Sequence, residues 1–174
     1  MHSKAMEIMY HEHQVILKAI HQLKSILERE NVTDYKSNII WFINFFKEYG
    51  DKFHHHKEED LLFKVLEKKN EMLGGGLVNE LIEHHEGFRK YLQEAVHFIH
   101  ANDFENLKEI LNDYTNNLID HIGAEDDELF VTADMILNET EKNNLYFSFV
   151  DKDTELNMGV KNKFEHSILN SEYL

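Results

Sequence analysis

Apolar residues recur every three to four positions along most of this chain, which is the period of helices with one buried face. The pattern predicts a first helix over about residues 3–30 and a second that follows a turn at 31–34. Lys68-Lys69-Asn70 is a C-terminal signature for the second helix, and a triple glycine at 74–76 is the clearest break in the chain. A third helix follows, and a turn at 101–103 leads into a fourth. Short connections between amphipathic helices of similar length favour an up-down-up-down four-helix bundle.

The composition supports an all-α fold. The 174 residues include no proline and only seven glycines, and both residue types are unfavourable within helices. We expect the bundle to span residues 1–136. Residues 137–174 should add a C-terminal helix, capped by Asn138 and containing Leu145, Phe147 and Val150, and a polar tail that packs on the bundle.

Polar groups interrupt the apolar stripe of each predicted helix. They are His13 in the first helix, His54 and Glu58 in the second, His85 in the third, and His121 and Glu125 in the fourth. A buried polar group without a partner costs about 1–3 kcal/mol and a charge costs more, whereas a whole domain is stable by about 5–15 kcal/mol. A shared ligand is the simplest compensation, so we expect these side chains to converge on one site.

The second and fourth helices carry the same motif. Residues 54–63 and 121–130 both read His-x-x-x-Glu, and both end in Leu-Phe. Side chains four residues apart lie on one face of an α-helix, so each motif presents an imidazole and a carboxylate to the same point. Two facing helices of this kind would supply two imidazoles and two carboxylates.

The expected depth of these residues in the bundle also agrees. His13 lies about 17 residues before the first turn and His54 about 20 residues after it, and at about 1.5 Å per residue these heights agree within one helical turn. His85 and His121 lie about 17 and about 19 residues from the turn at 101–103. All four helices should therefore present their polar groups at one level.

Imidazole and carboxylate together suit iron, manganese or zinc. A structural zinc ion takes four ligands, whereas six ligands in a two-fold arrangement fit two ions that keep open positions. Glutamates from facing helices bridge two ions in carboxylate di-iron bundles. We therefore predict a carboxylate-bridged pair of iron, manganese or zinc ions with positions open for water, oxygen or nitric oxide.

Neighbouring residues offer alternatives to this assignment. His55 and Glu59 share the four-residue spacing but lie about 100° off the apolar stripe of an α-helix. His84 competes with His85, and the phase of the stripe favours His85. Other polar residues beside the two motifs would form a solvated face or hold the ligands by hydrogen bonds: His56, Glu59, Asp60, Asp126, Asp127 and Glu128.

Charge and composition narrow the possible partners. The net charge of −15, from 33 acidic and 18 basic residues, disfavours nucleic acid and anionic membranes. There is no cysteine, so thiol chemistry and disulfides are ruled out. No segment has the apolar run of a signal peptide or a membrane span, and we expect a cytoplasmic protein. Apolar residues of the C-terminal tail would dock it on the bundle or form a homodimer.

Four motifs carry a resemblance to a known family. They are Glu12-His13-x-x-Ile16, His54-His55-x-Lys57-Glu58-Glu59-Asp60-x-Leu62-Phe63, Glu83-His84-His85-Glu86-Gly87-x-Arg89 and His121-x-x-x-Glu125. Together they resemble the hemerythrin-like, HHE cation-binding family over about residues 6–133. The resemblance implies a four-helix bundle that encloses a non-heme di-iron centre, with the tail packed as an extra helix.

Two departures separate this chain from the oxygen-carrying hemerythrins. Those proteins have a second histidine on the third helix, where this chain has Arg89, and His-x-x-x-x-Asp on the fourth helix, where it has His121-x-x-x-Glu125. The pattern is similar to the repair-of-iron-centres and mycobacterial hemerythrin-like proteins. It implies reaction with nitric oxide or peroxide, or iron release, in oxidative or nitrosative stress. The alternatives are an iron-sensing or iron-storage module without turnover and a reversible oxygen binder.

Overall fold

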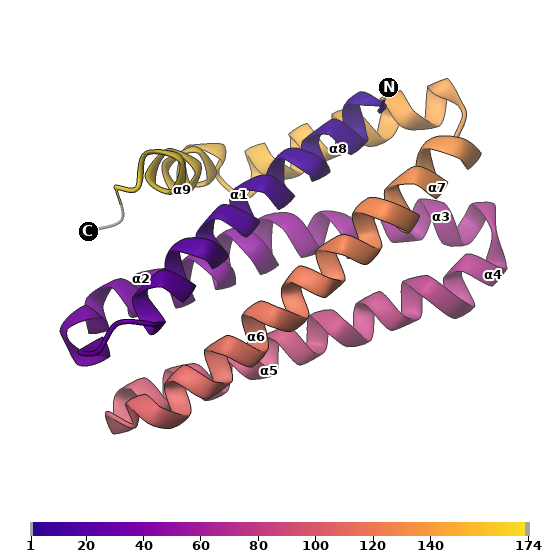
Figure 1. The fold of residues 1–174 in the computed structure, drawn as a ribbon. Coiled ribbons are helices and arrows are strands. Elements are labelled where there is room, and N and C mark those ends of the chain that lie inside the picture. The colour runs from indigo at the N-terminus through magenta and orange to yellow at the C-terminus, as the bar shows by residue number, and fades with distance from the viewer. Residues whose placement is uncertain (1, 173–174) are drawn as a thin grey trace.

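The computed structural model describes residues 2–172. Every regular element in that range is a helix, which confirms the all-α prediction. No helix among these residues is both long and apolar enough to cross a membrane. Four long helical segments lie side by side, and two C-terminal helices cover one flank of them (Figure 1).

The first two long segments are joined by a short connection. The first segment is α1 (Lys4–Leu27), which begins after the N-cap residue Ser3. A 3-10 turn, η1 (Val32–Tyr35), leads from it into the second segment. That segment is continuous from residue 36 to residue 69 and is built from α2 (Lys36–Phe45), the π-helical turns η2 (Phe46–His55) and η3 (Glu58–Leu62), and α3 (Phe63–Lys69).

The second segment ends at Asn70, as its C-terminal signature indicated, but the expectation of a break at the triple glycine was wrong because residues 74–78 are helical. Asn70 has extended backbone (φ −150°, ψ 104°), and its side-chain oxygen accepts a hydrogen bond of 3.0 Å from the Met72 amide. This local bond stabilises a turn one helical turn before the glycines. The third segment follows as α4 (Glu71–Leu73), η4 (Gly74–Val78) and α5 (Asn79–Ala101).

The turn at 101–103 lies where the sequence placed it. Asn102 adopts the left-handed conformation (φ 55°), and the Asp103 side chain accepts a hydrogen bond from the Asn106 amide as an N-cap. The fourth segment then runs through α6 (Phe104–Ala124), the π-helical turn η5 (Glu125–Leu129) and α7 (Phe130–Ile136). The two His-x-x-x-Glu motifs therefore both lead into a π-helical turn that starts at their glutamate.

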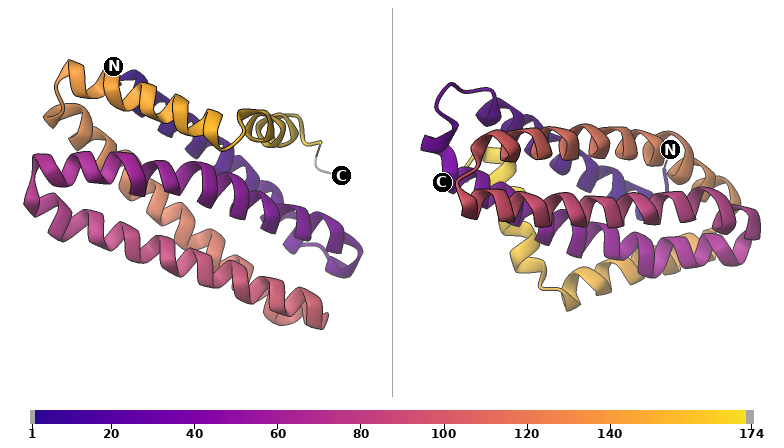
Figure 2. Two further views of the ribbon diagram at one scale, coloured as in Figure 1. Left: turned by 180° about the vertical axis from the view of Figure 1, so that it is seen from behind. Right: turned by 90° about the horizontal axis from the view of Figure 1, so that it is seen from below.

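Two helices follow the long segments, where the sequence indicated one helix and a tail. Asn138 and Glu141 form a capping box at the start of α8 (Glu139–Glu155), as the predicted cap requires. Asn157 then turns the chain with a positive φ of 79°, and α9 (Met158–Asn170) follows. Figure 2 shows α8 alongside α1 and α9 turned away from the direction of α8.

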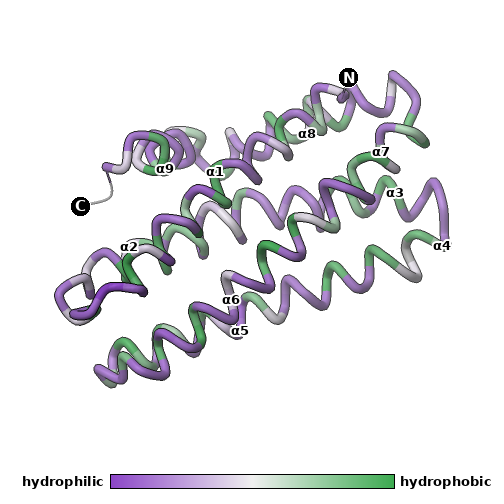
Figure 3. The backbone as a smooth tube through the Cα atoms, viewed as in Figure 1, coloured by the Kyte–Doolittle hydropathy of each residue, from purple (hydrophilic) through white to green (hydrophobic). Residues whose placement is uncertain are grey.

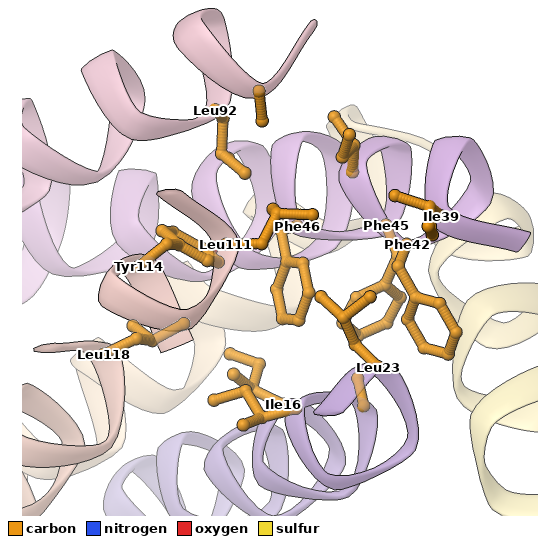
Figure 4. Packing of buried hydrophobic residues seen from close by; sticks show 14 of the residues in the cluster. Ile16, Leu23, Ile39, Phe42, Phe45, Phe46, Leu92, Leu111, Tyr114 and Leu118 are labelled. Atoms are coloured by element: carbon orange, nitrogen blue, oxygen red, sulfur yellow. The ribbon is translucent and has the colours of Figure 1, made fainter. Parts of the chain in front are cut away.

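The buried apolar residues form two separate clusters. Hydrophobic and hydrophilic residues alternate along the long helices (Figure 3), and the larger cluster packs Phe42, Phe46 and Tyr114 together (Figure 4). The smaller cluster, near the other end of the segments, includes Phe63 and Phe130.

A polar layer separates these two clusters. In α1, residues 15–27 contribute to the larger cluster and residues 5–9 to the smaller one, with His13 between them. In the second and third segments the buried histidines likewise lie between the two sets of apolar positions. In the fourth, His121 and Glu125 flank Ile122, the last residue of the larger cluster, and Leu129 begins the smaller one. The polar groups, which were expected at one height along the helices, therefore form a layer across the middle of the bundle.

Alanine substitutions of Phe149 and Phe147 test whether α8 is part of the core. Phe149 is 0% exposed in the smaller cluster, whereas Phe147, two residues earlier, is 62% exposed. Phe149→Ala should lower the free energy of unfolding by about 3–5 kcal/mol, and Phe147→Ala should change it by less than about 0.5 kcal/mol. Chemical denaturation measures both values. Equal, small effects would show that α8 does not pack as described.

Candidate metal centre

The structure brings together all six residues that the sequence singled out, and it adds His55. Their side-chain nitrogen and oxygen atoms form two groups in which all atoms lie within 4.8 Å of one another. The first group contains His13, His54, Glu58 and Glu125, and the second contains His55, Glu58, His85 and His121. All seven residues are buried.

A pair of imidazoles with facing nitrogens lies in each group. The Nε2 atoms of His13 and His54 are 2.9 Å apart in the first group. In the second group the Nε2 atoms of His85 and His121 are 3.1 Å apart. Each pair joins two helical segments that follow one another along the chain, α1 with the second segment and α5 with α6.

The two glutamates lie between the groups. Glu58 is 3.6 Å from Nε2 of His54 through Oε1 and 3.5 Å from Nε2 of His85 through Oε2. Glu125 places Oε2 3.3 Å from Nε2 of His13 and 3.2 Å from Nε2 of His121. Each carboxylate therefore contacts one histidine of each group, which is the placement that a carboxylate bridging two cations requires.

All four oxygens of these carboxylates are buried without a hydrogen-bond partner. Glu58 and Glu125 are both 0% exposed. Such groups cost about 1–3 kcal/mol each, and charged ones more, unless something compensates for the lost solvation. The donor set and its unpaired oxygens fit metal cations held between the two groups.

Carboxylates outside the two groups fix the orientation of three of the histidines. Nδ1 of His13 lies 2.6 Å from Oδ1 of Asp126, and Nδ1 of His85 lies 2.8 Å from Oε1 of Glu59. Nδ1 of His54 is 2.9 Å from Oε2 of Glu12. A proton held on Nδ1 leaves Nε2 as the electron-pair donor, and this is how histidine ligands are commonly oriented.

Burial and neighbouring charges determine the protonation of the histidines. Burial lowers the pKa of His54 to about 3 and that of His121 to about 4, although nearby carboxylates oppose the change. Burial also lowers the pKa of His85 well below its ordinary value, and His55 adds to this effect. Neutral imidazoles are the form that binds metal.

Two other groups carry the protons of the metal-free centre. Burial disfavours charge on His13, but its hydrogen bond with Asp126 and the nearby Glu125 carboxylate raise its pKa to about 9. Burial raises the pKa of Glu58 well above its ordinary value, and the adjacent Glu125 carboxylate raises it further. The metal-free centre therefore holds protons near its carboxylates, where metal cations would replace them.

His55 is the member that the sequence reasoning missed. Its ring stacks on that of His85, with centroids 3.8 Å apart and an interplanar angle of 11°. The prediction assumed about 100° of rotation per residue, as in an α-helix, but His54 and His55 end the π-helical turn η2. Because a π-helix has a wider turn, adjacent residues are rotated less and both can face the interior. The doubled histidine of the motif was the available signal.

The remaining candidates lie around the seven residues. His85 is buried in the second group, as the phase of the stripe indicated, whereas His84 is exposed with Nδ1 3.4 Å from Nδ1 of His121. Arg89 donates to Asp51 at 2.8 Å and to Glu59 at 2.7 Å, so Glu59 links it to His85 by hydrogen bonds. Glu59 and Asp126 are thus hydrogen-bond partners of the histidines, one of the two roles expected for them.

A cavity of about 310 Å³ reaches the second group from the surface between α5 and α6. His84, Phe88 and Tyr91 line it on one side and Asn117, Asp120 and His121 on the other. It gives a small molecule a path to the edge of His121, while the two apolar clusters close the layer above and below.

Comparison with known proteins identifies the family. The profile of the hemerythrin HHE cation binding domain matches residues 4–133, which includes all seven residues of the two groups. Searches of curated proteins and of solved structures each found no match. Because the profile covers most of the chain and the buried histidines and glutamates converge within it, the chain belongs to the hemerythrin HHE cation-binding domain family.

Proposed function

We propose that the protein binds two iron ions, one in each group, with Glu58 and Glu125 between them. The observation that carries the proposal is the set of four buried, unpartnered carboxylate oxygens between facing imidazole pairs. Manganese and zinc share this ligand preference, and iron is favoured by the family. We also propose that the four long segments form the up-down-up-down bundle that this family implies.

We further propose that the centre reacts with or senses a small ligand, namely oxygen, nitric oxide or peroxide. Bound iron would supply one-electron redox chemistry and an open position for such a ligand. The protein residues hold the imidazoles by carboxylates, exclude bulk water through the apolar clusters and admit small molecules along the cavity at His121. The presence of Arg89 on α5, which binds Asp51 and Glu59, leaves the second group without a second histidine from that helix.

This ligand set supports the subgroup similar to the repair-of-iron-centres proteins, with a role in oxidative or nitrosative stress. An iron-sensing module without turnover is the second candidate. It is favoured by the hydrogen bond between His54 and Glu12, because Glu12 is also bonded to the C-terminal helices.

Glu58→Gln tests the role of the carboxylate between the groups. The change keeps the shape of the side chain but removes one of two adjacent buried acids, so the metal-free protein should become more stable by about 1–3 kcal/mol. The variant should also fail to retain two metal ions. Thermal unfolding of the metal-free form and metal analysis of the loaded form measure these two effects.

Glu48→Gln, on the same segment, is the matched control, because Glu48 pairs only with Lys52 at the surface. It should leave stability within about 0.5 kcal/mol and metal content unchanged. A Glu58→Gln protein that retains two ions with wild-type affinity would contradict the bridging role.

Oxidation of the iron-loaded protein tests the proposed chemistry. The protein is loaded with ferrous iron without oxygen, and its near-ultraviolet and visible spectrum is followed as air, nitric oxide or peroxide is admitted. We expect irreversible oxidation in air and a spectral change with nitric oxide, both lost in Glu125→Ala. Reversible oxygen bands would instead make the protein an oxygen carrier. Consumption of nitric oxide or peroxide beyond the amount of iron would separate turnover from sensing or storage.

A further inference from the structure

Four buried charged side chains lie beside the first group and connect it to the C-terminal helices. These residues, here called the charge quartet, are Glu12, Lys57, Asp153 and Lys161, and each is at most 7% exposed. Glu12 and Lys57 belong to the long segments, whereas Asp153 is in α8 and Lys161 is in α9. The last two lie beyond residue 133, where the match to the family ends.

Each charged group of the quartet is paired with groups of opposite charge within the quartet. Lys57 Nζ donates to Glu12 Oε1 and, at 2.8 Å, to Asp153 Oδ1. Lys161 Nζ donates to Glu12 Oε1 and to Asp153 Oδ2, both at 2.5 Å. Two cations thus balance two carboxylates, and each carboxylate is shared by both lysines. Burying charges is tolerated only when every member has such partners, so loss of one member leaves the others uncompensated.

Glu12 connects the quartet to the metal centre. Its Oε1 accepts from both lysines, while its Oε2 accepts from Nδ1 of His54 at 2.9 Å. The two lysines fix the position of Glu12 through Oε1, and Glu12 in turn orients the His54 ring through Oε2. The orientation of His54 toward the first group therefore depends on two residues from the C-terminal helices.

The other oriented histidines have no such dependence. The partners of His13 and His85 are Asp126 and Glu59, which lie in the long segments and are 23% and 24% exposed. Solvent can compensate those carboxylates if their contacts change. Glu12, at 0% exposure, is bonded to buried groups instead, namely the two lysines of the quartet and His54.

We propose that Asp153 and Lys161 are positioning residues for the first group, so that docking of α8 and α9 and metal binding at His54 are thermodynamically coupled. The inference rests on the proposed metal centre. Coupling of this kind is reciprocal: docked helices strengthen metal binding, and bound metal strengthens docking by the same factor. The C-terminal helices would then report the occupancy of the centre, which gives the sensing function a physical route.

Asp153→Asn tests the coupling, with Co²⁺ as the probe because its visible spectrum reports the ligands of each ion. We expect the wild type to bind two Co²⁺ ions. In the variant, the affinity of one ion should fall by about 10–100-fold, as is usual when a hydrogen-bond partner of a ligand is disturbed. The other ion, held by the second group, should keep its affinity within about 3-fold and its spectrum. Asp153→Glu should recover part of the loss.

Gln22→Ala is the matched control. Gln22 of α1 donates to the Ile168 carbonyl of α9 at 3.1 Å and to Ser171 Oγ at 3.0 Å, but it does not touch the quartet. The control should loosen the end of α9 without changing either Co²⁺ affinity. It separates a loss of helix docking contacts from a loss of His54 positioning.

Hydrogen exchange of the wild-type protein tests the reciprocal effect without any substitution. Adding Co²⁺ should slow amide exchange across residues 139–170 as well as around the centre, and this added protection should be absent in Asp153→Asn. The coupling alone would be overturned if the wild type binds two Co²⁺ ions and Asp153→Asn binds both with wild-type affinity. It would also be overturned if the variant loses affinity equally for both ions. A wild type that binds no Co²⁺ would overturn the proposed centre and the coupling with it.

Discussion

The constraint on which this structure depends is the burial of Glu58 and Glu125 between two groups of imidazoles. Their four oxygens have no hydrogen-bond donor, and neither side chain reaches solvent. Two adjacent acids in a low-dielectric interior repel each other, and burial alone already disfavours their charged forms. Cations at the two groups remove both costs at once. The metal-free protein can only reduce them by holding protons on Glu58 and near His13.

The rest of the fold supports this polar layer. Burial of the apolar clusters on either side contributes free energy that offsets the cost of burying the polar layer. The clusters also keep water away from the layer. Both His-x-x-x-Glu motifs lead into π-helical turns at their glutamates, at η3 and η5. Such turns are costly and are found mostly at functional sites, because they re-aim side chains within an otherwise regular helix. Their repetition at the same point of both motifs gives the centre its approximate two-fold character.

Much of this arrangement could be predicted because the relevant signals are local and periodic. An apolar stripe with the period of a helix, interrupted once per segment by a polar group, predicts both the helices and the level at which those groups meet. His55 could not be placed in this way, because the prediction assumed regular α-helical rotation and the backbone there is π-helical. The C-terminal signature at Asn70 marked the end of the second helix, but the run of glycines, which was expected to break the chain, lies within a helical turn.

The C-terminal helices show a different limit of sequence reasoning. Asp153 and Lys161 are polar, so they make the tail look solvated, yet both are buried. Asp153 accepts from Lys57 and Lys161, and Lys161 also donates to Glu12. Pairings between charges so far apart in sequence have no periodic signature. The proposed metal-ligating role of the two groups likewise rests on the placement of their donor atoms and not on any one motif.

The binding of two metal ions between the imidazole groups can be tested by anomalous X-ray diffraction. Data from crystals of the iron-loaded protein would be recorded on both sides of the iron absorption edge. We expect two iron peaks in the polar layer, one beside His13 and His54 and the other beside His55, His85 and His121. Glu58 and Glu125 should contact both. A single peak served by one group, or iron only on the acidic surface, would contradict it.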